Sequence, residues 1–364
     1  EQTGRVVQDR QWPYGLQTAL EAREGLDLHP EGAVLGSLTI HHFMKLYPRI
    51  CGMSATARPA AEELREAYGL RTVVIPTNRP CARRDRGDRV YATSEARDQA
   101  LVAEIARAHA AGRPVLVGTR TVEESERLAA LLGRAGLEAQ VLNARHDAAE
   151  AEIVAEAGEA GALTIATNMA GRGTDIRLGG ADEAQQEQVA ALGGLYVIGT
   201  NRHESRRIDQ QLRGRAGRQG DPGSSRFFIS MEDDLVRRYG VARMIPAAAR
   251  EPDEAGLLAN AVVERSIAHA QRIIEGQHHA MRQGLRDYSE HPERQRQLVL
   301  ELRARLMRGE DLAPLPSSPR IEALREAAGE ELLERAHQRL SLLELDRCWS
   351  EHLALAADLR DTLF

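Results

Sequence analysis

A loop that combines two glycines with a carboxylate follows a short aliphatic run at residues 163–167. Gly171, Gly173 and Asp175 lie in this loop. In parallel α/β sheets ligands bind at the carboxyl ends of strands, so the loop is well placed to contact one. Glycine permits close backbone approach, and an aspartate accepts hydrogen bonds from a ribose hydroxyl. An ordinary strand-to-helix turn with a solvated aspartate is the alternative that a bare Gly-x-Gly leaves open.

An arginine-rich segment at residues 202–226 is the second candidate. It holds seven arginines and three acids, in a chain whose net charge is −6. Such density predicts an anionic partner, and the planar fork of arginine pairs with phosphate oxygens at two points. Arg215 and Arg218 are three residues apart, so we expect them on one face of a helix. The alternative is a solvated basic helix neutralised by Glu204 and Asp209.

Small residues at 52–57 (Gly-Met-Ser-Ala-Thr-Ala) form a third, weaker candidate, which alone predicts a packed turn. A phosphate-binding P-loop is excluded within the chain, because Lys45 is its only lysine and follows no glycine loop. A disulfide framework and a metal site are not expected either. Cys51, Cys81 and Cys348 are far apart, and the adjacent histidine pairs point to different sides of a helix.

Composition bounds the class of protein. The 364 residues are enough for two to three domains, and 42% hydrophobic with 28% charged residues is typical of a globular chain. The negative net charge argues against a basic protein that wraps nucleic acid. No run of apolar residues is long enough to span a membrane. The arginines at 294–308 predict a solvated helix face, with contact to anionic lipid as the alternative. The start at Glu1, without a methionine or a leader pattern, predicts a piece of a longer protein.

Periodicity predicts an α/β region followed by a helical one. Short aliphatic runs alternate with polar-faced helices, which indicates βαβ units and a parallel sheet. The predicted strands are 72–75, 114–118, 139–142, 163–167, 195–198 and 226–230. Thr121 and Glu124 form a capping box that predicts the start of a helix.

After about residue 240 the apolar spacing is helical. Residues 255–290 predict one long helix that Pro292 ends or kinks, with further helix to about residue 308. A proline-rich turn then precedes a last helical stretch over residues 320–360.

Together the three candidate segments resemble motifs III, V and VI of the superfamily 2 helicase-like ATPases. They read Ser-Ala-Thr at 54–56, Gly-Arg-Gly-Thr-Asp at 171–175 and Gln-x-x-Gly-Arg-x-Gly-Arg at 211–218. The sequence around these motifs is similar to that of the SecA family of preprotein translocation motors. It includes Pro-Thr-Asn-Arg-Pro at 76–80, Gly-Leu-Tyr-Val-Ile-Gly-Thr at 194–200, Arg-His-Glu-Ser-Arg-Arg-Ile-Asp at 202–209 and Leu-Asp-Arg-Cys-Trp-Ser-Glu-His-Leu at 345–353.

The resemblance implies a RecA-like parallel-sheet nucleotide-binding domain followed by a mainly α-helical scaffold region. The implied domains are the end of the preprotein cross-linking domain at 1–27, the tail of the first nucleotide-binding domain at 28–60, the second nucleotide-binding domain at 61–238 and the scaffold at 239–364. The short turn at 308–320, where most family members carry a wing domain, and the stretch at 289–292 are departures. They predict a reduced or absent wing and an accessory-type member.

The resemblance also implies the site. Asp175, with the loop glycines Gly171 and Gly173, would bind the nucleotide, and Arg215 and Arg218 would face its γ-phosphate. Arg207 would belong to a gate between the two nucleotide-binding domains. The cofactors implied are ATP and Mg²⁺. The Walker A loop and the magnesium ligands are expected upstream of this chain, so the chain alone is expected to hydrolyse no ATP.

The partners implied are preproteins, the Sec membrane channel, an anionic membrane surface and a second copy in a homodimer. The location implied is the cytoplasm, peripheral on the cytoplasmic face of the bacterial inner membrane. An RNA or DNA helicase is the alternative function, because the three motifs serve both classes. Aromatic residues make up only 4% of the chain and its charge is negative, so nucleic acid is not the expected partner. A third hypothesis is a non-catalytic protein that binds preprotein or the channel without hydrolysing ATP.

Overall fold

The computed structural model describes residues 12, 15–28, 37–142, 150–167 and 174–363. The chain divides into two compact units. The first extends from Gly52 to His279, and the second joins the segment that ends at Cys51 to the residues from Ala280 onward. The functional domain bounds expected from the sequence are a separate assignment and stay a prediction.

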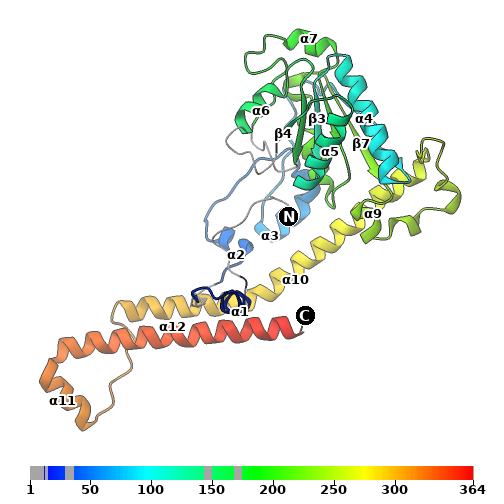
Figure 1. The fold of residues 1–364 in the computed structure, drawn as a ribbon. Coiled ribbons are helices and arrows are strands. Elements are labelled where there is room, and N and C mark those ends of the chain that lie inside the picture. Colours follow the sequence, from blue (N-terminus) through cyan, green and yellow to red (C-terminus); the bar gives the residue numbers. More distant parts are fainter. Residues whose placement is uncertain (1–11, 13–14, 29–36, 143–149, 168–173, 364) are drawn as a thin grey trace. The chain divides into compact units, whose positions relative to one another are not determined.

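A parallel sheet of seven strands forms the centre of the first unit (Figure 1). The order across it is β1-β7-β6-β3-β5-β4, and β2 also pairs with β7. The strands are β1 (Arg83–Asp85), β2 (Arg89–Tyr91), β3 (Val115–Thr119), β4 (Gln140–Leu142), β5 (Leu163–Thr167), β6 (Leu195–Gly199) and β7 (Gly223–Ser230). β1 and β2 lie one after the other along β7, so they share one edge of the sheet.

Five of the six strands predicted from the sequence are confirmed as β3 to β7, and the strand predicted at 72–75 is wrong. Val73, Val74 and Ile75 are between 65% and 83% exposed. A β-branched run favours extended backbone, but it becomes a strand only when another strand supplies hydrogen bonds. No neighbour among the described strands pairs with this run.

Helices cover both faces of the sheet, as a parallel sheet requires. On one face α4 (Ser94–Ala110) and α5 (Val122–Arg134) bury Leu101, Ile105, Leu128 and Leu132. The core on the other face receives side chains from α6 (Glu150–Glu156), α7 (Gln186–Ala191), α8 (Arg206–Arg213), α9 (Asp234–Arg238) and the beginning of α10 (Ala261–Met307). The expected class, a parallel α/β sheet followed by helices, is confirmed.

The predicted start of α5 is confirmed by its cap. The Thr121 hydroxyl accepts a hydrogen bond from the Glu124 backbone N–H at 3.1 Å. The Glu124 carboxylate accepts in return from the backbone N–H of Arg120, at 2.9 Å, rather than from the cap residue itself. The first bond satisfies a donor that a helix start leaves unpaired, and the second fixes the residue just before the cap.

The second unit is helical. The later part of α10 packs along α12 (Glu330–Leu363), with α11 (Pro319–Ala328) between them in the chain (Figure 1). Arg303 pairs with Asp346 at 3.0 Å, and the Gln338 amide donates to the Leu306 carbonyl at 2.7 Å. The unit also contains α1 (Leu16–Glu24) and α2 (Ile40–Lys45), whereas α3 (Ala61–Tyr68) belongs to the first unit.

Pro292 lies inside α10, which is 47 residues long, so the expected end of the helix at this residue is wrong, whereas the further helix expected to about residue 308 is confirmed. A proline inside a helix removes one backbone hydrogen bond and crowds the preceding turn, at a cost of about 3 kcal/mol. Side chains on either side of Pro292 are buried or paired within the helix. Ser289 and Glu293 are both buried, and Glu293 pairs with Arg296 at 2.7 Å.

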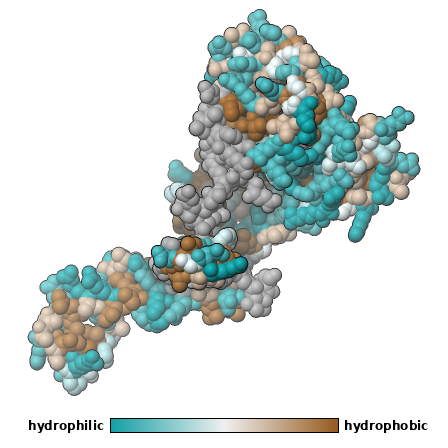
Figure 2. Space-filling view, in the orientation of Figure 1, coloured by the Kyte–Doolittle hydropathy of each residue, from teal (hydrophilic) through white to brown (hydrophobic). Residues whose placement is uncertain are grey.

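The basic face predicted at 294–308 is neutralised within the protein. Each of its five arginines pairs with a carboxylate: Arg294 with Glu290, Arg296 with Glu293, Arg303 with Asp346, Arg305 with Asp311 and Arg308 with Glu310. Apolar side chains also reach the surface around α11 (Figure 2). Within the described part of the chain, no helix is long and apolar enough to cross a membrane.

Candidate functional site

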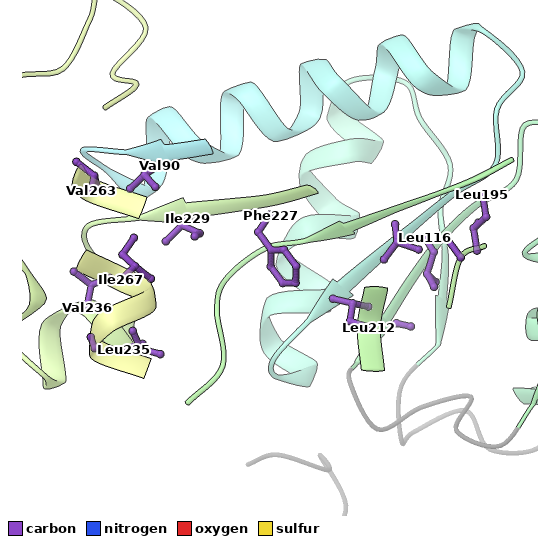
Figure 3. Close-up of a cluster of buried hydrophobic side chains, with 14 of the residues drawn as sticks. Val90, Leu116, Leu195, Leu212, Phe227, Ile229, Leu235, Val236, Val263 and Ile267 are labelled. Carbon is purple, nitrogen blue, oxygen red and sulfur yellow. The ribbon is translucent and has the colours of Figure 1, made fainter. Parts of the chain in front are cut away.

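A cavity of about 220 Å³ lies on the α6–α8 face of the sheet, in the first unit. Leu116, Leu142 and Leu212 form part of its apolar wall, and Figure 3 shows Leu212 directed toward Leu116. Its polar lining comes from three segments far apart in the sequence. These supply Ser54 and Thr56, then Thr164 and Thr167, and finally Gln210, Gln211, Arg215 and Arg218. The three candidate segments of the sequence analysis therefore meet at one place.

Asp175 lies beside this cavity and contacts the arginine segment directly. Its carboxylate accepts a hydrogen bond from the Arg218 guanidinium at 2.6 Å. The Arg215 guanidinium donates to the Thr174 carbonyl at 3.2 Å. The predicted ribose acceptor and both predicted phosphate-binding arginines are thus neighbours. Gly171 and Gly173 lie outside the described residues.

The helical placement expected for Arg215 and Arg218 is wrong. α8 ends at Arg213, Arg215 lies in the turn that follows, and Arg218 begins a three-residue 3-10 helix (Arg218–Gly220). Gly217 adopts φ +70°, a left-handed conformation that favours glycine. The helix has already ended before Gly214, the left-handed Gly217 separates the two arginines, and Arg218 folds back so that its Nε donates to the Gly214 carbonyl at 3.1 Å.

The dense positive charge at 202–226 is largely met from within. Arg202 pairs with Asp88 at 2.7 Å and with Asp209 at 3.0 Å, and Arg206 pairs with Glu275 at 2.7 Å. Arg226 lies 3.7 Å from Glu104. Arg213 lies 3.9 Å from Asp88, so the expectation of an external anion is wrong for four of the seven arginines of the segment. Of the seven arginines in this segment, only Arg215 and Arg218 line the cavity.

Arg207 lies apart from these residues. It is exposed on the first turn of α8 and is not among the described residues that line the cavity. The structure thus brings Arg215, Arg218 and Asp175 together but does not bring Arg207 to them. Its role in a gate between two domains stays a prediction.

Sequence reasoning missed the Thr164 hydroxyl. Thr164 is 1% exposed and lines the cavity, and its hydroxyl has no hydrogen-bond partner among the described residues. A buried hydroxyl without a partner is costly, so a polar group entering the cavity would gain from contact with it. No local signal distinguishes this threonine, because it sits in an otherwise ordinary buried strand.

The two guanidinium groups at the cavity favour an anion there. Among the residues described, no group of three or more histidines, cysteines or acids is arranged to hold a metal. Two guanidinium groups with nearby hydroxyls suit a phosphate-bearing ligand.

Comparison with known proteins identifies the family that shares these segments. The SecA P-loop domain model matches residues 80–188 and 181–250, the SecA Wing and Scaffold domain model matches 257–330, and the SecA DEAD-like domain model matches 3–65. A solved structure of the yeast DEAD-box splicing factor Prp28 matches loosely, with a TM-score of 0.36 and 16% identity over 58% of this chain and 43% of that one.

Curated relatives match nearly all of the chain. Protein translocase subunit SecA 2 of Mycobacterium tuberculosis (strain ATCC 25618 / H37Rv) is 46% identical over 99% of this chain and 45% of its own length. SecA 2 of Corynebacterium efficiens is 47% identical, and SecA 3 of Mycolicibacterium vanbaalenii is 45% identical, each over 99% of this chain and 47% of its own length. The chain thus spans less than half the length of these relatives. It belongs to the SecA family.

Proposed function

We propose that this chain supplies the second nucleotide-binding domain and the helical scaffold of an ATP-driven preprotein translocase, of the accessory type. The observation that carries the proposal is the convergence of Ser54, Thr56, Arg215 and Arg218 on one cavity, with Asp175 beside it. The names of the relatives, protein translocase subunits SecA 2 and SecA 3, support it further.

Each residue would have a distinct task at this site. Arg215 and Arg218 would bind phosphate oxygens and neutralise the charge that develops as the terminal phosphate leaves. Asp175 would accept hydrogen bonds from the ribose, and Gly171 and Gly173 would let the backbone approach the nucleotide. ATP supplies the phosphoanhydride bond whose hydrolysis drives transport. The cationic rim fits the phosphate end of ATP.

The rest of the catalytic machinery would lie outside this chain. The Walker A lysine and the Mg²⁺ ligands are proposed to belong to the part of the relatives that this chain does not cover. Arg207 would act at the gate between the two nucleotide-binding domains. Without a lysine cradle and a metal ion the two arginines have little transition-state charge to stabilise, so we expect no ATP turnover by this chain alone.

The proposed partners are those of a translocase. They are unfolded preproteins, the Sec membrane channel, an anionic membrane surface and a second copy of the protein. The proposed location is the cytoplasmic face of the inner membrane, as a peripheral protein. The pairing of every arginine on the 294–308 face with a carboxylate weakens the case for lipid contact at that face.

Binding and turnover measurements on the purified chain test the proposal. We expect weak binding of Mg-ATP that Arg215→Ala and Arg218→Ala abolish and that Arg206→Ala, which removes a distant paired arginine, leaves intact. We also expect unfolded presequence peptide to bind. Tight, steeply salt-dependent binding of single-stranded RNA would instead favour a helicase. Peptide binding with no nucleotide binding would favour a non-catalytic binding protein, and ATP turnover by the chain alone would contradict the division of the site.

A further inference from the structure

A buried polar network joins α8 to α10 within the first unit. Asp209, on α8, is 1% exposed, and both of its carboxylate oxygens are occupied. Oδ1 accepts from the backbone N–H of His203 at 3.1 Å, and the His203 ring Nδ1 lies at the same distance. Oδ2 accepts from Arg202 at 3.0 Å and from the Gln271 amide at 2.8 Å. Burial alone would raise the pKa of Asp209, but the bonds from His203, Arg202 and Gln271 lower it below its ordinary value.

Gln271 is the member of this network that α10 contributes. It is 2% exposed, and its Nε2 donates both to the His203 carbonyl at 2.7 Å and to Asp209 Oδ2. Both partners are acceptors, so they fix which end of the amide faces them. Gln271 therefore holds the residues on either side of the loop that leads into α8.

The position of Gln271 is itself rigid. Val263, Ile267, Ala270 and Ile274 are buried on the same face of α10. Figure 3 shows Val263 and Ile267 beside Val90, Ile229, Leu235 and Val236. Residues three and four apart share one face of a helix, so Gln271 is a polar residue within an apolar stripe. An amide placed there is expensive to bury unless its hydrogen bonds are satisfied, as they are here.

The other end of α8 leads to the predicted phosphate-binding arginines. The helix has only eight residues, and Leu212 anchors it to the sheet. Arg218 is tied to the end of this helix through Gly214, and Arg215 reaches the Thr174 carbonyl. A shift at the start of so short a helix therefore displaces both arginines relative to Asp175.

We propose that Gln271 is a positioning residue, which acts through Asp209 to set the place of Arg215 and Arg218 at the cavity. The role of those arginines rests on the proposed function, whereas the positioning is measurable without nucleotide. Loss of the amide leaves the His203 carbonyl and Asp209 short of a donor, and the loop and α8 lose their link to α10.

Hydrogen exchange on the 364-residue chain, without nucleotide, tests this directly. Gln271→Leu removes both bonds with little change in volume, and Gln277→Leu makes the same change at an exposed position of the same helix. Gln271→Glu adds a pH-dependent arm, because the new carboxylate repels Asp209 while both are ionised, and protonation at lower pH restores a hydrogen-bond donor. The Nε–H resonance of Arg218 reports the position of the arginine itself.

We expect Gln271→Leu to speed exchange over residues 203–218 about tenfold and to shift the Arg218 resonance, while β3 and β6 stay as protected as in the wild type. Gln277→Leu should match the wild type. Gln271→Glu should resemble Gln271→Leu at about pH 7.5 and return toward the wild type at about pH 5. The proposal would be overturned by unchanged exchange at residues 203–218 in Gln271→Leu, or by an equal loss of protection across the sheet. Failure of Gln271→Glu to regain protection at about pH 5 would also overturn it. Added Mg-ATP that leaves the wild-type cavity residues unperturbed would contradict the proposed function alone.

Discussion

The Arg218 guanidinium lies 2.6 Å from the Asp175 carboxylate, so two residues assigned to different ends of a nucleotide contact one another. Both side chains are partly exposed, at 36% and 47%. An exposed ion pair of this kind contributes about 0.2–1 kcal/mol, which a phosphate can readily outcompete. The proposed nucleotide binding would therefore involve an exchange, in which Arg218 leaves Asp175 for a phosphate oxygen.

Removal of that carboxylate separates the two roles. We expect Asp175→Ala to tighten the binding of inorganic pyrophosphate about two- to fivefold, because Arg218 no longer has a competing anion. The same change should weaken ATP relative to pyrophosphate, because the ribose loses its acceptor. Calorimetric titration of both ligands measures the ratio. Glu187→Ala, which removes an exposed acid on α7, is the charge-matched control, and an Asp175→Ala effect no larger than this control would count against the exchange.

The two arginines should behave as catalytic groups in the complete ATPase proposed above. We expect Arg215→Lys and Arg218→Lys each to lower kcat by about 10³-fold or more, because a lysine cannot reproduce the two-point contact of a guanidinium. Steady-state ATP hydrolysis measures the effect. Arg206→Lys, at a residue paired with Glu275 away from the cavity, should leave kcat close to the wild type. Equal losses in all three variants would indicate a general effect on folding.

The core strands of this fold are predictable because a strand buried on both faces needs a continuous run of apolar residues, which is visible in the sequence. β3, β5 and β6 are buried along their whole length. β1 and β2 escape detection because each is only three residues long and includes arginine. They are held by pairing with β7 and by cation–π contacts, such as that of the Arg89 guanidinium carbon, which lies 6.0 Å from the centre of the Phe228 ring. Such support is tertiary, and no local propensity reveals it.

The candidate site was predictable in part of its membership but not in its geometry. Residue types and order indicated Asp175, Arg215 and Arg218, and the structure brings them together. The turn at Gly217 that achieves this replaces the expected helix face, because a left-handed glycine ends the helical spacing. The Asp209–Gln271 contact lies 62 residues apart in the chain, so only the fold makes it visible.

The sharp turn before β6 makes Gly194 a sensitive position. Its φ is +66°, and a Cβ built there would lie 1.9 Å from the Pro222 carbonyl oxygen. We expect Gly194→Ala to lower the free energy of unfolding by about 3 kcal/mol or more, because both the backbone and the neighbouring carbonyl must shift. Gly133→Ala, near the end of α5, meets no atom within 4 Å. It should be neutral or stabilising by about 0.5 kcal/mol, and chemical denaturation compares the two.

A buried hydroxyl on the face of the sheet that α4 and α5 cover offers a second stability test. The Tyr196 hydroxyl donates to the Glu104 carboxylate at 2.7 Å, and burial together with this bond raises the pKa of the tyrosine. Tyr196→Phe should destabilise the protein by about 1–3 kcal/mol, because Glu104 loses a donor in a buried setting. Tyr239 makes the equivalent bond to Glu204 near the surface, at 3.1 Å. Tyr239→Phe should therefore cost clearly less, and similar losses in the two variants would be inconsistent with burial as the cause.

The buried Asp233 carboxyl makes stability depend on pH in an unusual direction. Burial raises its pKa to about 6, although Arg97 and the Ser230 N–H favour the charged form. An unfolded aspartate titrates near pH 3.9, so between about pH 4 and pH 6 the folded protein holds a proton that the unfolded chain releases. The contribution of this group is thus greatest below about pH 4 and is lost as the pH rises through about 6. A shift of about two units corresponds to at most about 3 kcal/mol.

Asp233→Asn isolates this contribution, because an amide keeps the shape of the side chain and does not titrate. The free energy of unfolding of the wild type minus that of Asp233→Asn should fall as the pH is raised from about 4 to about 6.5. Urea denaturation at a series of pH values gives this difference. Asp234→Asn removes a carboxylate from the same segment at a position that is 66% exposed, and it serves as the control. A difference that rises with pH, or that matches the control, would show that Asp233 is charged in the folded protein throughout this range, held by its pair with Arg97.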